Sequence, residues 1–283
     1  MHVFLAGATG AVGRRIVGLL IKEGHRVTGT TRRPEKAEFL RALGAEPVVV
    51  DAYDRERLHE AVAAARPDLI MNQLTDLVVY DVAANAKLRR EGTRNLVDAA
   101  RAAGVRRFVH QSLGWIYAPG DGPAEEDEPL DLDGDAARRS LVGSVAEAEQ
   151  AAREVPETVV LRYGLFYGPD TWYAPDGLKA AEARAGTLVA SREMINFLHV
   201  DDAAEAAVLS LDWPSGAVNV TDDEPAPGTE WLPAFCRAVG APDPEISTAE
   251  PADWARRGVA NRKAKGLGWA PEHRSWRDGF SAF

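Results

Sequence analysis

The first residues of the chain run from a short apolar stretch into a glycine-rich turn and then into a helix-like stretch. The apolar run Val3–Ala6 is followed by Gly7-x-x-Gly10-x-x-Gly13, and apolar residues then recur at helical spacing. Glycine lets the backbone turn tightly and approach a pyrophosphate, which the free N–H groups at the start of the next helix stabilise. The succession predicts a dinucleotide-binding site rather than an ordinary strand-to-helix turn. Its candidate cofactor-binding residues are Gly7, Thr9, Gly10, Ala11, Val12 and Gly13.

The predicted second strand, Arg26–Thr31, indicates which dinucleotide binds. It is followed by Arg32 and Arg33, where an NAD-specific site usually places an acidic residue against the ribose 2′-hydroxyl. Guanidinium groups match the geometry of a phosphate, so the two arginines favour NADP(H); the alternative is that they only flank a solvated helix start. The third predicted strand, Val48–Asp51, closes with Asp51, which either contacts the adenine or forms a turn.

Composition excludes several classes of protein. At 283 residues and 46% hydrophobic content, the chain is long enough for one large core, or for one core and a smaller lobe. A net charge of −10 argues against nucleic acid or an anionic membrane as a partner. The single Cys236 rules out an internal disulfide, and six scattered histidines give little support for a metal site. No apolar run approaches membrane-spanning length, so we expect a cytoplasmic monomer or homodimer that acts on a small molecule.

Strand-like and helix-like patterns alternate through the first 160 residues or so. This alternation predicts an α/β fold, a doubly wound parallel sheet of the Rossmann type with helices on both faces. The expected strands are Val3–Ala6, Val27–Thr30, Val48–Asp51, Leu69–Asn72, Phe108–Gln111 and Thr158–Arg162.

The regular alternation is lost in two places. Between Pro119 and Asp135 it gives way to Gly, Pro and acidic residues, which predicts a surface loop that either faces solvent or covers the site. Beyond Gly168 the elements become short, which predicts a small mixed lobe. We therefore expect a dinucleotide-binding domain over 1–165 and a smaller, interleaved substrate lobe over 166–283. Ligands of open α/β sheets bind at the carboxyl ends of the strands, so the cleft between sheet and lobe is the expected substrate site.

Motifs later in the chain carry a resemblance to a known family. They are Gly92–Arg101, Arg107–Ser112, Leu161–Pro169, Phe197–Ala203 and Asn219–Pro225. In order and spacing they resemble the extended short-chain dehydrogenase/reductase family, the group of sugar-nucleotide epimerases and dehydratases, over nearly the whole chain. The resemblance implies further cofactor contacts from Gln73, Leu74 and Gln111.

The chain departs from that family at the positions that carry its acid–base chemistry. The family uses a tyrosine, a lysine four residues later, a serine or threonine, and an asparagine; here the corresponding residues are Leu141, Val145, Leu113 and Arg89. Ser112 stands one residue too early and points to the other side of an extended strand. Because no Tyr-x-x-x-Lys occurs anywhere in the sequence, a small shift of register does not restore the pair. The usual proton relay is therefore not expected.

Two further departures concern the substrate. Leu165 and Ile195 replace an asparagine and an arginine that hold sugar nucleotides in relatives, which argues against a nucleotide sugar. Aromatic residues in segments that line the family's cleft suit an apolar or aromatic ligand, although each of them can instead pack the lobe. The candidate substrate-binding residues are Leu113, Trp115, Tyr117, Leu141, Val145, Leu165, Trp172 and Tyr173.

Three functions fit these observations. The favoured one is an NADP(H)-dependent oxidoreductase that acts on a small apolar or aromatic carbonyl compound, or an activated C=C bond, with a non-standard proton donor. Tyr117 is the first candidate for that donor, followed by Tyr163, Tyr167 and His199. The alternatives are a non-redox isomerase, lyase or cyclase on the same scaffold, and a catalytically silent NADP(H) sensor.

Overall fold

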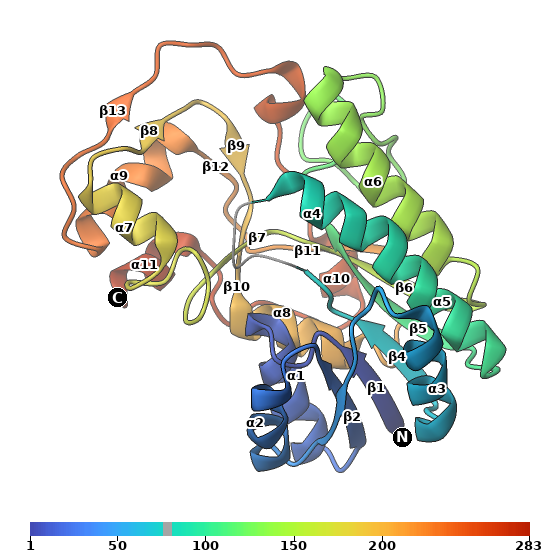
Figure 1. Cartoon of the computed structure of the whole chain (residues 1–283). Helices are drawn as coiled ribbons and strands as arrows, with labels where there is room; N and C mark the ends of the chain where they lie inside the picture. The colour runs from blue at the N-terminus through green and yellow to red at the C-terminus, as the bar shows by residue number, and fades with distance from the viewer. Residues whose placement is uncertain (76–80) are drawn as a thin grey trace. The chain divides into compact units, whose positions relative to one another are not determined.

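The computed structural model describes residues 1–75 and 81–283, and its largest sheet has seven strands (Figure 1). The strand order is β11-β6-β5-β4-β1-β2-β3, with β1 parallel to both β2 and β4. The order reverses beside β1, which confirms the predicted doubly wound α/β fold. The strands are β1 (His2–Ala6), β2 (Arg26–Thr31), β3 (Glu46–Val49), β4 (Leu69–Asn72), β5 (Arg107–Leu113), β6 (Glu157–Tyr163) and β11 (Gly216–Val220).

The third strand was predicted two residues too late. β3 pairs with β2 from Glu46 to Val49, and the expected strand end at Asp51 lies beyond it. The Asp51 side chain accepts a hydrogen bond from the backbone N–H of Tyr53, and its carbonyl accepts one from Asp54. Aspartate that bonds to the backbone two residues on forms a turn, so Asp51 closes the strand early.

Aspartate side chains cap three of the helices that connect these strands. The N–H groups of Arg57, Ala84 and Arg138 donate to the carboxylates of the N-cap residues Asp54, Asp81 and Asp135, respectively, at 2.8–3.1 Å. The helices are α1 (Ala11–Lys22), α2 (Ala37–Ala42) after a 3₁₀ turn η1 (Pro34–Lys36), α3 (Arg55–Ala65), α4 (Val82–Lys87), a π turn η2 (Leu88–Gly92), α5 (Thr93–Ala102) and α6 (Ala136–Ala152).

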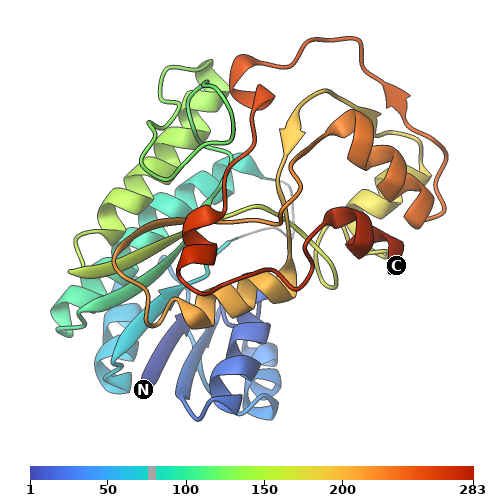
Figure 2. The same cartoon turned by 180° about the vertical axis from the view of Figure 1, so that it is seen from behind.

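The core of the sheet lies between its central strands and the helices on each side. Phe4, Ile70 and Phe108, from three adjacent strands, are fully buried in a cluster that Leu58 of α3 and Leu96 of α5 complete. In Figure 1, α3, α5 and α6 lie together along this face, and the view from behind in Figure 2 agrees. Helix α1 packs against β2 through its own buried apolar residues, Ile16, Val17 and Leu20.

The described residues divide into two compact units, each built from several segments. Unit 1 comprises 1–112, 132–161 and 207–217; unit 2 comprises 113–131, 162–206 and 218–283. The segment 207–217 of unit 1 thus comes from the later part of the chain, and 113–131 of unit 2 comes from the earlier part. The assignment of a cofactor role to 1–165 and a substrate role to 166–283 stays a prediction.

Unit 2 is made of short elements around an aromatic core. Tyr167, Phe197, Phe235, Trp276 and Phe280 are fully buried in it, and several of their rings meet edge to face. The elements that lie wholly or partly in unit 2 are β7 (Leu165–Tyr167), α7 (Leu178–Arg184), β8 (Val189–Ala190), β9 (Met194–Ile195), β10 (Phe197–His199), α8 (Val200–Leu209), β12 (Ala226–Pro227), α9 (Gly228–Ala238), β13 (Glu245–Ile246), η3 (Asp253–Arg256), α10 (Arg262–Gly266) and α11 (Trp276–Ser281).

The acidic segment 119–135 is irregular, as predicted, and within unit 2 it is fixed by specific contacts. Glu128 forms an ion pair with the buried Arg257, with atoms 2.7 Å apart. The backbone N–H of Ala124 donates to the carbonyl of Gly258, and Ala124 itself is fully buried. Part of the acidic run is therefore held by contacts within unit 2 and is not simply a solvated charge run.

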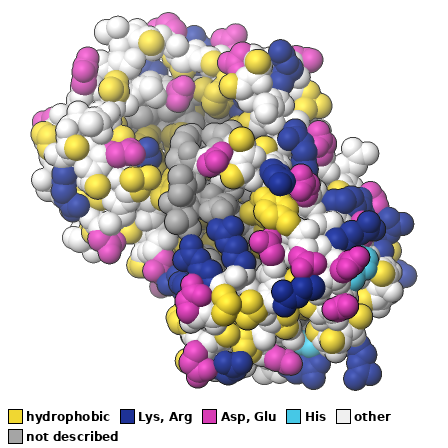
Figure 3. Space-filling view, in the orientation of Figure 1, with side chains coloured by type: hydrophobic (Ala, Val, Ile, Leu, Met, Phe, Trp, Pro, Cys, Tyr) yellow, Lys and Arg dark blue, Asp and Glu magenta, His cyan; other side chains and the backbone are white. Residues whose placement is uncertain are grey.

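Two further observations concern the charges on the surface and the lengths of the helices. On the coloured part of the face in Figure 3, Lys and Arg side chains lie interspersed with Asp and Glu side chains. Within residues 1–75 and 81–283, no helix is both long enough and apolar enough to cross a membrane.

Candidate functional site

The glycine turn between β1 and α1 forms a backbone cradle that side chains would fill. Gly7 has φ +86°, and a Cβ there would overlap the carbonyl of Gln73. A Cβ on Gly13 would overlap the carbonyl of Gly7. The N-cap of α1 is Gly10, which has no side chain to cap the helix, so the first N–H groups of α1 remain available to an anion. The cradle fits a dinucleotide pyrophosphate, as the sequence predicts for this segment.

The end of β2 presents two arginines and no acid. Arg32 and Arg33 are exposed, and the buried Thr31 hydroxyl accepts a hydrogen bond from the N–H of Arg33 at 3.1 Å. This bond shapes the backbone that carries the arginines. The preference for a 2′-phosphate predicted from these two arginines stays a prediction. Asp51, the predicted adenine contact, uses one carboxylate oxygen for the turn with Tyr53.

The end of β4 is fixed by a buried polar network. The Asn72 side chain donates to Thr93 Oγ1 at 3.1 Å and accepts from the N–H of Leu74 at the same distance. Gln73, between Asn72 and Leu74 in the chain, is buried, and neither polar atom of its side chain has a partner among the residues that the structure describes. A buried amide without partners is rare, and a bound molecule would satisfy its donors and acceptor. This observation fits the predicted cofactor role of Gln73, while that of Leu74 stays a prediction.

Ser112, next to the predicted cofactor contact Gln111, forms a hydrogen bond with another side chain. Its hydroxyl donates to Glu149 Oε1 at 2.6 Å, and Arg153 donates to the other carboxylate oxygen at 2.9 Å. On the same strand, burial lowers the pKa of His110 to about 4, so this imidazole is neutral. The predicted substrate contacts Leu141 and Val145 lie on α6, half-buried and buried respectively, and their side chains have no proton to transfer.

In unit 2, the leading donor candidate is held by two partners. The Tyr117 hydroxyl donates to Asn219 Oδ1 at 2.6 Å and accepts from Arg162 Nη1 at 2.8 Å. Burial raises the pKa of Tyr117 to about 12, despite the nearby guanidinium. A phenol so held is a weak acid near neutral pH. The sequence did not indicate the partners Arg162 and Asn219, because both come from distant strands.

The remaining donor candidates are also buried among protein groups. The Tyr163 hydroxyl donates to the carbonyl of Ala203 at 3.3 Å, and the Tyr167 hydroxyl donates to that of Ser275 at 3.5 Å. Burial raises the pKa of Tyr167 well above its usual value. His199 Nδ1 accepts from the N–H of Asp201 at 3.3 Å. The catalytic roles predicted for Tyr117, Tyr163 and His199 stay predictions.

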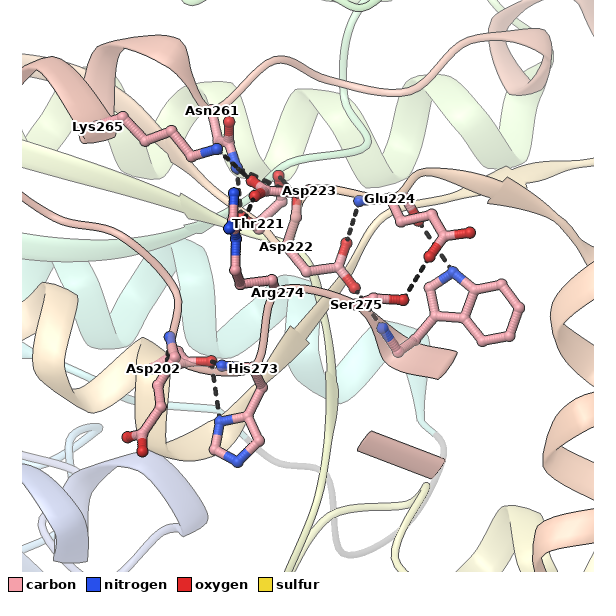
Figure 4. A network of polar contacts seen from close by, with 12 residues as sticks. Asp202, Thr221, Asp222, Asp223, Glu224, Asn261, Lys265, His273, Arg274 and Ser275 are labelled. Atoms are coloured by element: carbon pink, nitrogen blue, oxygen red, sulfur yellow. Dashed lines mark hydrogen bonds and ion pairs between the residues drawn. The ribbon is translucent and has the colours of Figure 1, made fainter. Parts of the chain in front are cut away.

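His199 belongs to a cluster that Figure 4 shows in part. Asp202 accepts hydrogen bonds from the N–H groups of Glu272 and His273, and His273 Nδ1 lies 3.2 Å from Asp202 Oδ2. Ligand-type atoms of His199, Asp202 and His273 lie within 4.8 Å of one another. The two imidazole rings stack at 3.6 Å and 21°, which sets their nitrogens side by side rather than toward one point. The cluster therefore joins α8 to the segment before α11, and we assign no metal to it.

The remaining substrate-binding candidates differ in their surroundings. Tyr173 packs edge to face against Phe197, Trp231 and Phe235 in the core of unit 2. Leu165 and Trp172 are half-buried beside the same core, and Leu113 and Trp115 are half-buried in the segment 113–131. Packing already accounts for the burial of Tyr173. The roles of all five in substrate binding stay predictions.

Together, the cradle and the sheet define a dinucleotide-binding α/β protein. Residues 3–221 match the model of the NAD dependent epimerase/dehydratase family, and the chain belongs to this family. This membership confirms the resemblance seen in the motifs and makes the chain a member of a nicotinamide dinucleotide-dependent group.

Individual relatives are reductases and an epimerase. A 3-diazoavenalumate denitrifying reductase from Streptomyces sp is 44% identical over 305 residues, covering 99% of each chain. A 4-hydroxy-2-methyl-3-oxo-4-farnesyl-3,4-dihydroquinoline-1-oxide ketoreductase from Stigmatella aurantiaca is 28% identical over 254 residues, covering 85% of this chain and 74% of its own. The structure of a UDP-glucose 4-epimerase from Thermus thermophilus in complex with NAD superimposes with a TM-score of 0.78 at 25% identity, over 99% of this chain and 97% of that one.

Proposed function

We propose that this chain is an NADP(H)-dependent reductase that replaces the nitrogen of an organic diazonium compound with hydrogen. The observation that carries the proposal is the absence of the family's proton relay: Leu141 and Val145 stand at the tyrosine and lysine positions. Ser112 is hydrogen-bonded to Glu149. A relative that is 44% identical is named as a denitrifying reductase of a diazo compound.

The stoichiometry of this reaction explains why the relay is dispensable. When bound, the reduced nicotinamide supplies a hydride. In the net reaction the C–N bond breaks and its electron pair leaves with N₂, while the hydride pair forms a C–H bond at the same carbon. An aryl diazonium and NADPH thus give the arene, N₂ and NADP⁺, and no net proton is consumed. Reduction of a ketone, in contrast, requires one proton for every hydride.

Reduction of a carbonyl or activated C=C bond is the second candidate, and a ketoreductase relative supports it. Here the donor is Tyr117, whose hydroxyl lies between Arg162 and Asn219. With a pKa of about 12, Tyr117 transfers a proton slowly at neutral pH, so we rank this candidate lower. NADP(H) is the proposed cofactor in both cases because Arg32 and Arg33 follow β2.

The test compares the two reactions with one preparation of protein. Purified protein is mixed with NADPH deuterated at the transferring position of the nicotinamide C4 and with 4-carboxybenzenediazonium. We expect oxidation of NADPH, release of N₂ and deuterium on the ring carbon that carried nitrogen. A Gly13→Ala variant, whose cradle is blocked, controls for direct reduction of the diazonium by NADPH. Deuterium transfer to ketones or enones, with none to the diazonium beyond this control, would refute the proposal.

A further inference from the structure

Arg89 is a half-buried cation that the proposed chemistry has not yet used. It lies on the π turn η2, which interrupts the helix between α4 and α5 and packs against α6. Single π turns within α-helices occur frequently at functional sites. Arg89 Nη1 is buried and has no hydrogen-bond partner among the residues that the structure describes. Burial lowers the pKa of Arg89 from its ordinary value, which shows that its charge is partly desolvated.

The neighbouring arginines on the same helical segment are all ion-paired. Arg90 Nε lies 2.6 Å from a carboxylate oxygen of Glu147. Arg94 pairs with Asp98 and with Glu154, at 2.6 and 2.7 Å. These pairs are on the surface, where water also solvates the charges. Arg89 alone among these three has a buried nitrogen without a partner, within the described residues.

The buried groups near Arg89 offer it no anion. Its charge acts on His110, which is fully buried and neutral because its pKa is about 4. The buried carboxylate of Glu149 on α6 is already engaged by Ser112 and Arg153. A partly desolvated guanidinium with no anion among the described residues costs free energy, and an anionic ligand would offset that cost.

We infer that Arg89 binds the carboxylate of the substrate and thereby selects anionic aromatic substrates. The guanidinium presents planar donors that match a carboxylate, and a buried charge-assisted bond is stronger than an exposed one. The inference rests on the proposed function for the identity of the substrate, because the relative's substrate is named as a carboxylate, an "-ate". The position aligned with the family's asparagine would then serve recognition and not proton transfer.

Binding tests the inference without relying on turnover. Calorimetry on the NADP⁺-loaded protein compares benzoate with methyl benzoate, which has nearly the same ring but no charge. We expect benzoate to bind more tightly, and Arg89→Met to weaken its binding by about 10- to 100-fold while methyl benzoate is unaffected. Arg89→Lys should restore part of the affinity, since it keeps the charge but not the bidentate geometry.

Arg90→Met is the matched control, because it removes a neighbouring arginine that is only paired on the surface. It should leave benzoate binding unchanged and lower the melting temperature slightly. Arg89→Met should not lower the melting temperature of the cofactor-free protein, because it removes a partly desolvated charge that has no ion pair among the residues that the structure describes. A marked loss of stability in Arg89→Met would identify a structural role and overturn the inference.

Three other outcomes would also overturn it. They are equal affinities of the wild type for benzoate and methyl benzoate, loss of NADP⁺ binding rather than benzoate binding in Arg89→Met, and binding of inorganic phosphate as tight as that of benzoate. If carboxylate selectivity depends on Arg89 but no diazonium compound is reduced, carboxylate binding by Arg89 is supported and the proposed reaction is refuted. The two conclusions are therefore separable.

Discussion

Ser112 Oγ lies 2.6 Å from Glu149 Oε1, and the carboxylate is fully buried. The bond joins β5 to α6 within unit 1, and Arg153 satisfies the other oxygen of the carboxylate. The position that corresponds to the family's serine or threonine is the next residue, Leu113, and Ser112 lies on the opposite side of the strand. Here the hydroxyl stabilises a buried charge, so this serine has a structural role.

Ser112→Ala should therefore reduce stability without slowing hydride transfer. Loss of the donor leaves Glu149 Oε1 buried and without this bond, so urea unfolding should show a loss of about 1–3 kcal/mol. Ser144→Ala is the control, because its hydroxyl donates to the carbonyl of Leu141 within the same helix, and its loss should cost less. A fall in kcat at unchanged stability would instead place Ser112 in the reaction.

The fold could be predicted from the sequence because the signals are local and repeated. Leu69–Asn72 was predicted with the bounds of β4, and the expected second strand coincides with β2. Apolar runs between glycine and proline breaks determine such strands, and parallel strands separated by helices allow few topologies. The bounds of β3 were wrong because a side-chain bond of Asp51, which apolar patterning does not detect, ends the strand.

The site was less predictable because its environment comes from residues distant in the chain. Tyr117 was chosen for its phenol, but its burial, its bonds to Arg162 and Asn219 and its raised pKa depend on strands more than 40 residues away. Arg89 was noted only as a departure from the family's asparagine. Only the structure shows that its buried Nη1 has no hydrogen-bond partner among the described residues.

Alanine at two glycines of the same helix should have opposite effects. Gly13→Ala places a Cβ against the carbonyl of Gly7, so the turn must shift, and both stability and NADPH affinity should fall. Gly18→Ala meets nothing within 4 Å, and alanine favours helix over glycine, so stability should rise by about 1 kcal/mol with NADPH affinity unchanged. Thermal unfolding and cofactor titration of both variants test the pair. Normal NADPH binding by Gly13→Ala would contradict the assignment of the cradle.

Asp222 should make stability depend on pH in an unusual direction. Burial raises its pKa to about 8, although its carboxylate accepts hydrogen bonds from the N–H groups of Glu224 and Trp276 (Figure 4). The folded state therefore holds a proton that the unfolded state loses at lower pH. The contribution of this group is complete below its ordinary pKa, near 4, and is lost as pH rises toward 8.

The measurement compares Asp222→Asn with the wild type in urea at several pH values. Asparagine does not titrate, so the stability difference in favour of the wild type should shrink as pH rises from about 4 to 8. Asp223→Asn is the control, because ion pairing with Lys265 and Arg274 accompanies a lowered pKa and its pH dependence should run the other way. A difference at Asp222 that grows with pH would show that the carboxylate is ionised in the folded protein.

Measuring cofactor preference tests the role proposed for the two exposed arginines after β2. If Arg32 and Arg33 bind a 2′-phosphate, calorimetry should show tighter binding of NADPH than of NADH, and changing both to alanine should reduce the gap by about 1–3 kcal/mol. NADH affinity should hardly change, because the pyrophosphate rests on the Gly7–Gly13 turn.

Arg41→Ala removes a nearby surface arginine whose ion pair with Glu38 is exposed, and it should affect the binding of neither cofactor. The dependence of NADPH affinity on salt should also weaken in the double variant, because fewer ionic contacts are made. Equal affinities of the wild type for NADPH and NADH would assign the arginines to the solvated start of the next helix and not to the cofactor.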